Sequence, residues 1–229
     1  MHDLMAVNRV VRAVRAAHGL SLLFTAVSPP HRLVLFADAS SITSSSASAQ
    51  TGDLVFLASD VAVWGSLLTE TPLVLLAWGS HKQRRVTHSS FAAETYALLD
   101  GMRAEIEVSC VLAHLTHGVD SALAPIDAFT DSLSLFNTMS AASILEPKEV
   151  NAGVAALREM YGAGSMASLT WVPDGAQLAD SLTKPSSSAS LRSTLSTGCY
   201  GLRLTGAFTK TFATDREERD VPRGTSSRA

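Results

Sequence analysis

The feature that most constrains this sequence is an apolar run that ends in a carboxylate. Residues 33–37 are all apolar, and Asp38 follows them directly. Pro29 and Pro30 precede the run, and a serine-rich stretch at residues 40–52 follows it. A continuous apolar run bounded in this way predicts a central strand that is covered on both faces of a sheet. An aspartate at its end lies at the rim of the core, where an unpaired charge is costly. Asp38 is therefore either a turn residue or part of a site.

The composition limits the classes of protein to consider. The chain has 229 residues, of which 46% are hydrophobic, enough for one core domain of about 150 residues with extensions. A formal net charge of −3 disfavours a broadly basic nucleic-acid-binding protein but leaves room for a local basic patch. Cys110 and Cys199 show neither metal-ligand spacing nor a disulfide framework, so we expect a reducing compartment. No apolar run approaches the roughly 20 residues that cross a bilayer.

The expected elements begin with strands and continue with strand–helix units. Strands are expected at residues 32–37, 54–58, 73–78, 126–130 and 169–172, and helices at residues 90–117, 132–142, 149–162 and 174–183. In chain order they are three strands, a helix, a strand, two helices, a strand and a helix. Three strands with short connections predict an antiparallel meander, and the later units predict parallel strands. We therefore expect an α/β protein with a mixed five-stranded sheet and helices on both faces.

Segments at both ends lie outside this pattern. Residues 3–18 predict a helix with a narrow apolar stripe, typical of a docking helix, although its arginines leave a targeting segment open. Asp174, with Gln177 three residues later, predicts a capping box at the start of the last helix of the domain. Residues 187–229 are polar and rich in serine, and we expect them to be disordered.

Glu94 is the most informative charged residue. Its helical neighbours at three, four and seven positions are small or apolar, which predicts that it lies on the buried face of the helix. A buried glutamate without a cation costs several kcal/mol or stays protonated. The alternative is a capping or solvated glutamate near the helix start at Ser89 or Ser90.

Two further aspartates stand in unusual places. Asp131 lies between a strand and a helix, where it is also a favoured N-cap residue. Asp180 lies within a predicted helix, where aspartate is a poor helix former, unless it is a surface residue paired with Lys184. With Asp38 and Glu94 these residues form a set of four carboxylates that would repel one another unless divalent cations neutralise them. Clustered oxygen ligands suit Mg²⁺ or Mn²⁺, and two ions about 4 Å apart can promote phosphodiester hydrolysis.

These residues lie in motifs whose joint order resembles the ribonuclease H domain of copia-type LTR retrotransposon Pol polyproteins. The matching segments are FADAS at 36–40, LAWGS at 76–80, KQ at 82–83, SSFAAETYAL at 89–98, TDS at 130–132, WVP at 171–173 and QLADSLTK at 177–184. Residues 3–12 also resemble the helix that ends the reverse transcriptase region of these polyproteins. The resemblance displaces the targeting interpretation.

The resemblance implies a domain organisation and an activity. Residues 1–27 would be a remnant of the reverse transcriptase C-terminal helix with a linker, and residues 32–186 a ribonuclease H-like domain, before the tail at 187–229. The activity implied is hydrolysis of the RNA strand in RNA–DNA hybrids with two Mg²⁺ (or Mn²⁺) ions, leaving a 3′-hydroxyl and a 5′-phosphate. The ribose 2′-hydroxyl distinguishes RNA from DNA in the strand that is cut.

The resemblance also assigns roles to the four carboxylates. Asp38 would bridge the two ions, and Glu94 and Asp131 would hold the ion on the leaving-group side. Glu94 would also lie near the ribose 2′-hydroxyl, and Asp180 would hold the ion that activates the water.

Residues that would contact the hybrid follow from the same motifs and from the basic segment at 81–85. They are Ser40, Lys82, Arg84, Arg85, Ser90 and Lys184. The basic segment would contact phosphates, or it is a solvated loop. The partners expected are an RNA–DNA hybrid and the reverse transcriptase portion of the same polyprotein, with no membrane and a monomeric isolated domain. The location expected is intracellular, in the cytoplasm or nucleus, within a virus-like particle if the element is active.

A second interpretation is a catalytically inactive retroelement relic or a nucleic-acid-binding module. Glu149 stands where many relatives carry a basic residue, which favours this alternative. The complete set of four carboxylates favours the enzyme.

Overall fold

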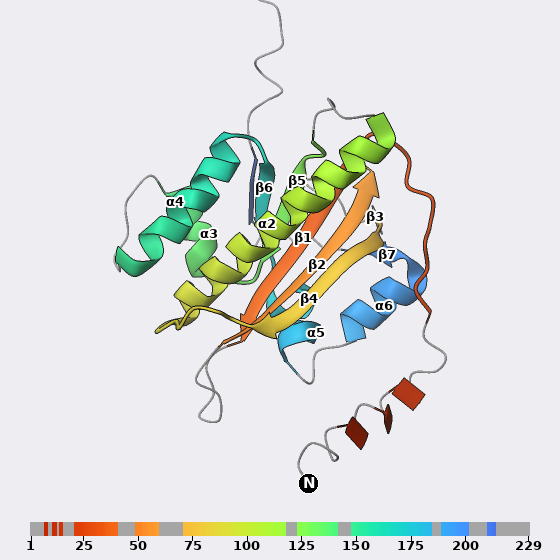
Figure 1. Cartoon of the computed structure of the whole chain (residues 1–229), viewed down its shortest axis with the longest axis horizontal. Helices are drawn as coiled ribbons and strands as arrows, with labels where there is room; N and C mark the ends of the chain where they lie inside the picture. Colours follow the sequence, from red (N-terminus) through yellow and green to blue (C-terminus); the bar gives the residue numbers. More distant parts are fainter. Residues whose placement is uncertain are drawn as a thin grey trace, which may run out of the picture.

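The computed structural model describes residues 7–8, 11–12, 14–15, 21–40, 49–59, 71–117, 123–141, 148–184, 189–201 and 210–213. Its centre is a mixed sheet with the strand order β4-β2-β1-β5-β6-β8 (Figure 1). The strands of this sheet are β1 (His31–Ser40), β2 (Gln50–Ser59), β4 (Val74–Lys82), β5 (Ile126–Thr130), β6 (Met166–Trp171) and β8 (Lys210–Ala213).

The strand directions place the end of β1 at the middle of one sheet edge. β1 pairs antiparallel with β2, and β2 pairs antiparallel with β4. On its other side β1 runs parallel to β5, which runs parallel to β6. This order and these directions confirm the expected α/β, ribonuclease H-like fold. The short strand β8 adds a sixth, antiparallel member beside β6 that the sequence did not predict.

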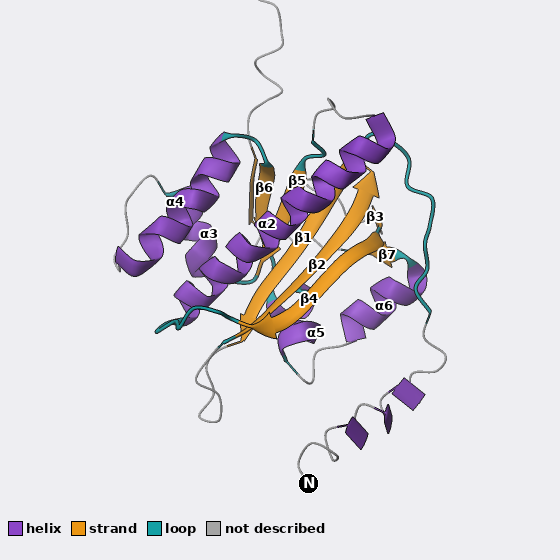
Figure 2. Cartoon of the chain, viewed as in Figure 1, coloured by secondary structure: helices purple, strands orange, loops and turns teal. Residues whose placement is uncertain are grey.

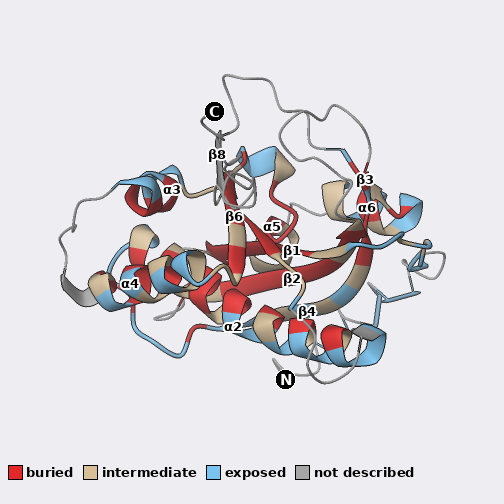
Figure 3. Ribbon diagram, turned by 90° about the horizontal axis from the view of Figure 1, so that it is seen from above, coloured by how far each residue is buried: buried red, intermediate tan, exposed pale blue. Residues whose placement is uncertain are grey.

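Helices cover both faces of the sheet (Figures 2 and 3). One core lies under α2 (Ser90–His117), α3 (Leu133–Ser140) and α4 (Lys148–Gly162). The other lies under α5 (Asp180–Thr183) and α6 (Ala189–Thr197). The residues of β1 alternate between these two cores: Leu33 and Leu35 face α2, whereas Val34 and Phe36 face the other side. This alternation explains why the apolar run of β1 has no polar interruption.

The start and the packing of α2 follow from small residues. The Ser89 hydroxyl accepts a hydrogen bond from the Ala92 backbone N–H at 3.1 Å, so Ser89 caps the helix. At Gly101 a Cβ atom would lie 3.1 Å from a methyl carbon of Leu35. The absence of that Cβ lets α2 lie close on β1. Glu94, near the start of α2, is thereby placed toward the end of β1.

The expected helix over residues 174–183 is wrong. Pro173 is followed by a single 3-10 turn, η1 (Asp174–Ala176), and α5 begins only at Asp180. Gln177 does not complete a capping box, because its side-chain amide donates to the backbone oxygen of Ala37 at 3.0 Å and reaches that of Phe129 at 3.4 Å. The buried amide satisfies backbone oxygens of β1 and β5 and interrupts the helix at the place where a capped helix was expected.

The expected disorder of residues 187–229 is contradicted for the part of that segment that the structure describes. α6 packs Leu191 and Leu195 against the second core, and the short strand β7 (Cys199–Tyr200) pairs with β3 (Thr71–Pro72). The Tyr200 ring is 5% exposed and its centroid lies 5.3 Å from that of Phe36. Only a few apolar residues make these contacts. The serines and threonines around them give the segment a polar composition, which is why the sequence predicted disorder.

Residues 7–8, 11–12 and 14–15 are helical, and Val7, Val11 and Val14 are exposed. The rest of the expected N-terminal helix lies outside the described residues. Among the helices described, none has the length and apolarity that crossing a membrane requires.

Candidate metal centre

Three aspartates meet at the edge of the sheet where β1 and β5 end. Asp38 lies two residues before the end of β1. Asp131 directly follows β5, the strand that runs parallel to β1. Asp180 is the first residue of α5, which packs on β1 and β2. One carboxylate oxygen from each aspartate lies within 4.8 Å of the others. Asp38 and Asp180 are buried, and Asp131 is partly buried.

Glu94, on α2, is coupled to this cluster through its charge, although it is not one of the residues whose oxygens lie within 4.8 Å of one another. Burial, together with the charges of Asp38 and Asp131, raises the pKa of Glu94 to about 9, against a backbone hydrogen bond from Ala39 and the charge of Lys184. Its Oε2 is buried and finds no hydrogen-bond donor among the described residues. Glu94 is partly buried, and the charges that raise its pKa are those of Asp38 and Asp131.

The pKa values of two of the three aspartates are also raised. Burial, together with the charge of Asp38, raises the pKa of Asp131 to about 7. Burial likewise raises the pKa of Asp180, although the hydrogen bond from Lys184 opposes it. Burial is the largest cause in Glu94, Asp131 and Asp180 alike, and neighbouring carboxylates add to it in each.

Lys184 supplies the one cationic side chain that is described in contact with the cluster. Its Nζ lies 2.7 Å from Asp180 Oδ1, and 3.8 Å from both Asp38 Oδ1 and Asp131 Oδ2. Burial alone would lower the pKa of Lys184, but the hydrogen bond to Asp180 and the surrounding carboxylates raise it overall. The Thr183 hydroxyl donates to Asp38 Oδ2.

The donor set fits a divalent cation. Asp38 Oδ1 and Glu94 Oε2 are buried oxygens without a hydrogen-bond donor among the described residues. A single ammonium group does not balance four carboxylates, and clustered carboxylate oxygens are ligands that Mg²⁺ and Mn²⁺ prefer. Asp38, Asp131 and Asp180, with Glu94 beside them, are the residues that would hold such an ion.

The predicted substrate residues do not all surround the cluster. Lys82, Arg84 and Ser90 are exposed. Arg85 stacks on the Tyr96 ring, with its guanidinium carbon 4.5 Å from the centroid. Ser40 accepts a hydrogen bond from the Gln50 backbone N–H at 3.3 Å, which closes the end of β1 against β2.

Two outcomes differ from the sequence-based assignment. Lys184 was expected to contact the hybrid or to pair with Asp180 at the surface, and its ammonium group lies among the carboxylates. Thr183 and Gln177 belong to the recognised motifs but received no role in the site, although their fixed spacing from Asp180 was the available signal. The side chain of Glu149 lies outside the described residues.

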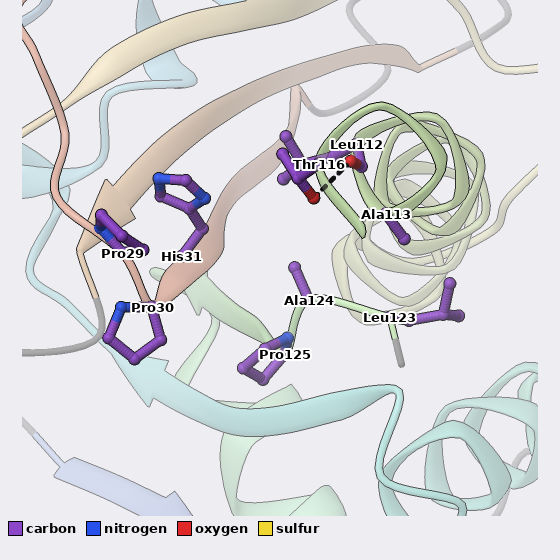
Figure 4. A pocket seen from close by; sticks show the side chains of 9 residues that line it. All are labelled: Pro29, Pro30, His31, Leu112, Ala113, Thr116, Leu123, Ala124 and Pro125. Carbon is purple, nitrogen blue, oxygen red and sulfur yellow. Dashed lines mark hydrogen bonds between the residues drawn. The ribbon is translucent and has the colours of Figure 1, made fainter. Parts of the chain in front are cut away.

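An apolar cavity of about 430 Å³ lies at the opposite end of β1 (Figure 4). It is bounded by His31 and its neighbouring prolines, by the C-terminal part of α2 near Leu112, and by the segment that ends at Pro125. No lining residue carries a carboxylate, so this cavity is separate from the metal centre.

The strand order and strand directions define the class of this domain, an α/β domain of ribonuclease H-like fold. Solved structures similar to it are themselves ribonuclease H domains. The N-terminal RNase H domain of a Mycobacterium tuberculosis protein, solved as a fusion with maltose-binding protein, is 16% identical with a TM-score of 0.46, covering 71% of this chain and 98% of that one.

Two further similar structures come from other sources. LC11-RNase H1, isolated from compost by a metagenomic approach and solved in complex with an RNA/DNA hybrid, is 11% identical with a TM-score of 0.46, covering 67% of this chain and 95% of that one. The protease–reverse transcriptase of prototype foamy virus is 17% identical with a TM-score of 0.37, covering 73% of this chain and 22% of that one. No protein-family model and no curated protein matches the sequence. These similarities concern the fold alone, and the function has to be argued from the site.

Proposed function

We propose that this chain is a divalent-metal-dependent endoribonuclease that hydrolyses the RNA strand of RNA–DNA hybrids. The observation that carries the proposal is the cluster of Asp38, Asp131 and Asp180, whose oxygens lie within 4.8 Å of one another, with Glu94 electrostatically coupled to it. Asp38, Glu94 and Asp180 lie on β1, α2 and α5, and Asp131 directly follows β5, which favours a prearranged site over a chance gathering of surface acids.

The protein groups have separable tasks in this proposal. Bound divalent cations would supply the positive charge that stabilises the pentavalent phosphorus and the departing oxygen. Asp38, Asp131 and Asp180 would hold that charge in place, and Glu94 would join them as a carboxylate. In the reaction a water oxygen bonds to phosphorus while the bond from phosphorus to the 3′-oxygen breaks. The water gives up a proton and the departing 3′-oxygen takes one up from solvent, so the products are a 3′-hydroxyl and a 5′-phosphate.

The finer assignment is a copia-type retroelement domain that uses two ions. Its support is the order of the sequence motifs over residues 36–184, together with four carboxylates, enough to share between two cations. The RNA–DNA hybrid and the reverse transcriptase portion of the same polyprotein are the partners that go with this assignment, and an intracellular location follows from it.

A substrate panel tests this proposal. The purified chain in Mg²⁺ is incubated with an end-labelled RNA annealed to DNA, with the same RNA alone, and with the corresponding DNA duplex. We expect cleavage of the hybrid only, and loss of about 100-fold or more in Asp38→Asn, since even partners of metal ligands contribute 10–100-fold. Asp100→Asn, at a more exposed acid of α2 that pairs with Arg103, is the matched control and should cleave like wild type.

The alternative function is a nucleic-acid-binding module without catalysis. The exposed basic side chains of Lys82 and Arg84 favour it, because they are available to phosphates whether or not the acids bind metal. If the folded protein binds the hybrid but leaves every substrate intact in Mg²⁺ and in Mn²⁺, the binding module is the correct function and the enzyme is not.

A further inference from the structure

We propose that Lys184 is a built-in counter-ion of the carboxylate cluster, which a divalent cation must displace in order to bind. The ammonium group thereby sets how tightly the site holds metal and keeps the metal-free domain folded. This inference rests on the proposed function only in taking the cluster as the metal centre.

The ammonium group contacts the same oxygens that a metal ion would use. Nζ of Lys184 is 2.7 Å from Asp180 Oδ1 and 3.8 Å from one oxygen each of Asp38 and Asp131. Mg²⁺ requires its oxygen ligands at about 2.0–2.1 Å in near-octahedral geometry. An ion bound to these three aspartates would therefore compete with the ammonium for the same ligands, and the two like charges would repel one another at short range.

The surroundings let the side chain leave without moving its backbone. The Lys184 backbone N–H donates to the backbone oxygen of Asp180 at 2.8 Å, and this hydrogen bond fixes the end of α5. The adjacent Thr183 hydroxyl anchors the same turn to Asp38. The Lys184 side chain is nevertheless 39% exposed, so its long flexible stem has an open route to solvent.

The charge balance gives the displacement two measurable consequences. Without metal, Lys184 offsets part of the repulsion among Asp38, Asp131, Asp180 and Glu94, so its loss should lower stability. With metal, that contribution must be given up, so the loss of Lys184 should increase affinity for the ion. A residue that merely assisted metal binding would have the opposite effect on affinity.

Calorimetric titration of Mn²⁺ into wild type and Lys184→Met tests the expected gain in metal affinity. We expect the apparent dissociation constant to fall about tenfold in the variant, within the 5–150-fold range of couplings between sites. Lys184→Arg keeps the charge and should stay within about threefold of wild type, below that range. Lys82→Met removes the same charge from an exposed position on β4 and is the matched control. Thermal unfolding in EDTA should show a lower midpoint for Lys184→Met but not for Lys82→Met.

A measurement on the wild-type chain covers the case in which Lys184→Met does not fold. Reductive methylation of lysines, read by mass spectrometry, should leave Lys184 protected in EDTA and modify it in saturating Mg²⁺, whereas modification of Lys82 should not change. Protection that persists when metal is bound would overturn the inference.

The outcomes separate this inference from the proposed function. If wild type binds Mn²⁺ and Lys184→Met binds it equally or more weakly, the counter-ion role is wrong and the metal centre stands. If no folded variant binds Mn²⁺ or Mg²⁺, both the inference and the metal centre are wrong.

Discussion

Glu105 shows at the residue scale how α2 tolerates acids on its buried face. It lies three turns after Glu94, it is fully buried, and neither carboxylate oxygen has a hydrogen-bond donor among the described residues. Burial raises its pKa well above the usual value, and the charges of Asp127 and Asp53 add to the shift. The sequence pattern that identified Glu94 applies equally to Glu105, but only the structure shows which of them faces the other carboxylates of the cluster.

Glu105→Met should stabilise the protein, and more so at high pH. Because the folded-state pKa lies above the unfolded one, the stability that Glu105 contributes is complete below the unfolded pKa of about 4.3 and is lost as pH rises through the folded value. Methionine has no such loss and leaves no buried oxygen unsatisfied, so we expect a gain of about 1–3 kcal/mol at neutral pH.

Urea unfolding of wild type and Glu105→Met in EDTA at pH 5, 7 and 9 measures this gain. Glu107→Met, at an exposed position of the same helix, is the control and should track wild type. A stability difference that shrinks as pH rises would show that Glu105 has a partner or remains charged.

At the element scale, α5 depends on a close contact with β2. A Cβ atom at Gly52 would lie 2.8 Å from Cβ of Leu182, 2.9 Å from Cγ2 of Thr183 and 3.1 Å from the Ala179 oxygen. This contact holds Asp180 against the end of β1. Sequence reasoning placed Asp180 inside a longer helix, because periodicity within the segment carries no information about the backbone oxygens of β1 and β5 that Gln177 satisfies.

Gly52→Ala should weaken metal binding although it alters no ligand. The added methyl group forces α5 away from β2 and displaces Asp180, and overpacking of this kind costs about 1–3 kcal/mol of stability. We expect a lower midpoint in thermal unfolding together with weaker Mn²⁺ binding by calorimetry. Gly175→Ala is the control, since a Cβ there meets nothing within 4 Å. Unchanged Mn²⁺ affinity in Gly52→Ala would mean that α5 does not position the site.

At the scale of the whole molecule, the sheet was predictable and the second layer of helices only in part. The strands at 32–37, 54–58 and 126–130 can be predicted from their apolar runs, because both faces of the central strands are covered. α6 and β7 could not be found in this way, since α6 is polar on average and contributes only Leu191 and Leu195 to the core. Likewise the sequence predicts four site acids, of which the structure brings Asp38, Asp131 and Asp180 together, but the place of Lys184 among them depends on how α5 ends.

Removal of α6 and β7 should destabilise the domain, contrary to the expected boundary at residue 186. Tyr200 covers Phe36, and its loss, with that of α6, resembles truncation of a large buried aromatic side chain, which costs about 3–5 kcal/mol. For a chain of this size that corresponds to a fall of roughly 10 °C in the melting midpoint. Calorimetry of chains 1–186 and 1–201 measures the difference, and equal midpoints would restore the boundary at 186.

The measurement that tests the metal centre most directly is the rate of hybrid cleavage as a function of Mg²⁺ concentration, for wild type and Asp38→Asn in parallel. Asp38 is the residue that α2, β5 and α5 all approach, so its carboxylate should be indispensable. We predict no cleavage in EDTA, saturation with Mg²⁺ for wild type, and a rate for Asp38→Asn at least about 100-fold lower at every concentration. Cleavage that persists in EDTA, or an Asp38→Asn curve that overlies that of wild type, would contradict a carboxylate-held divalent ion as the basis of activity.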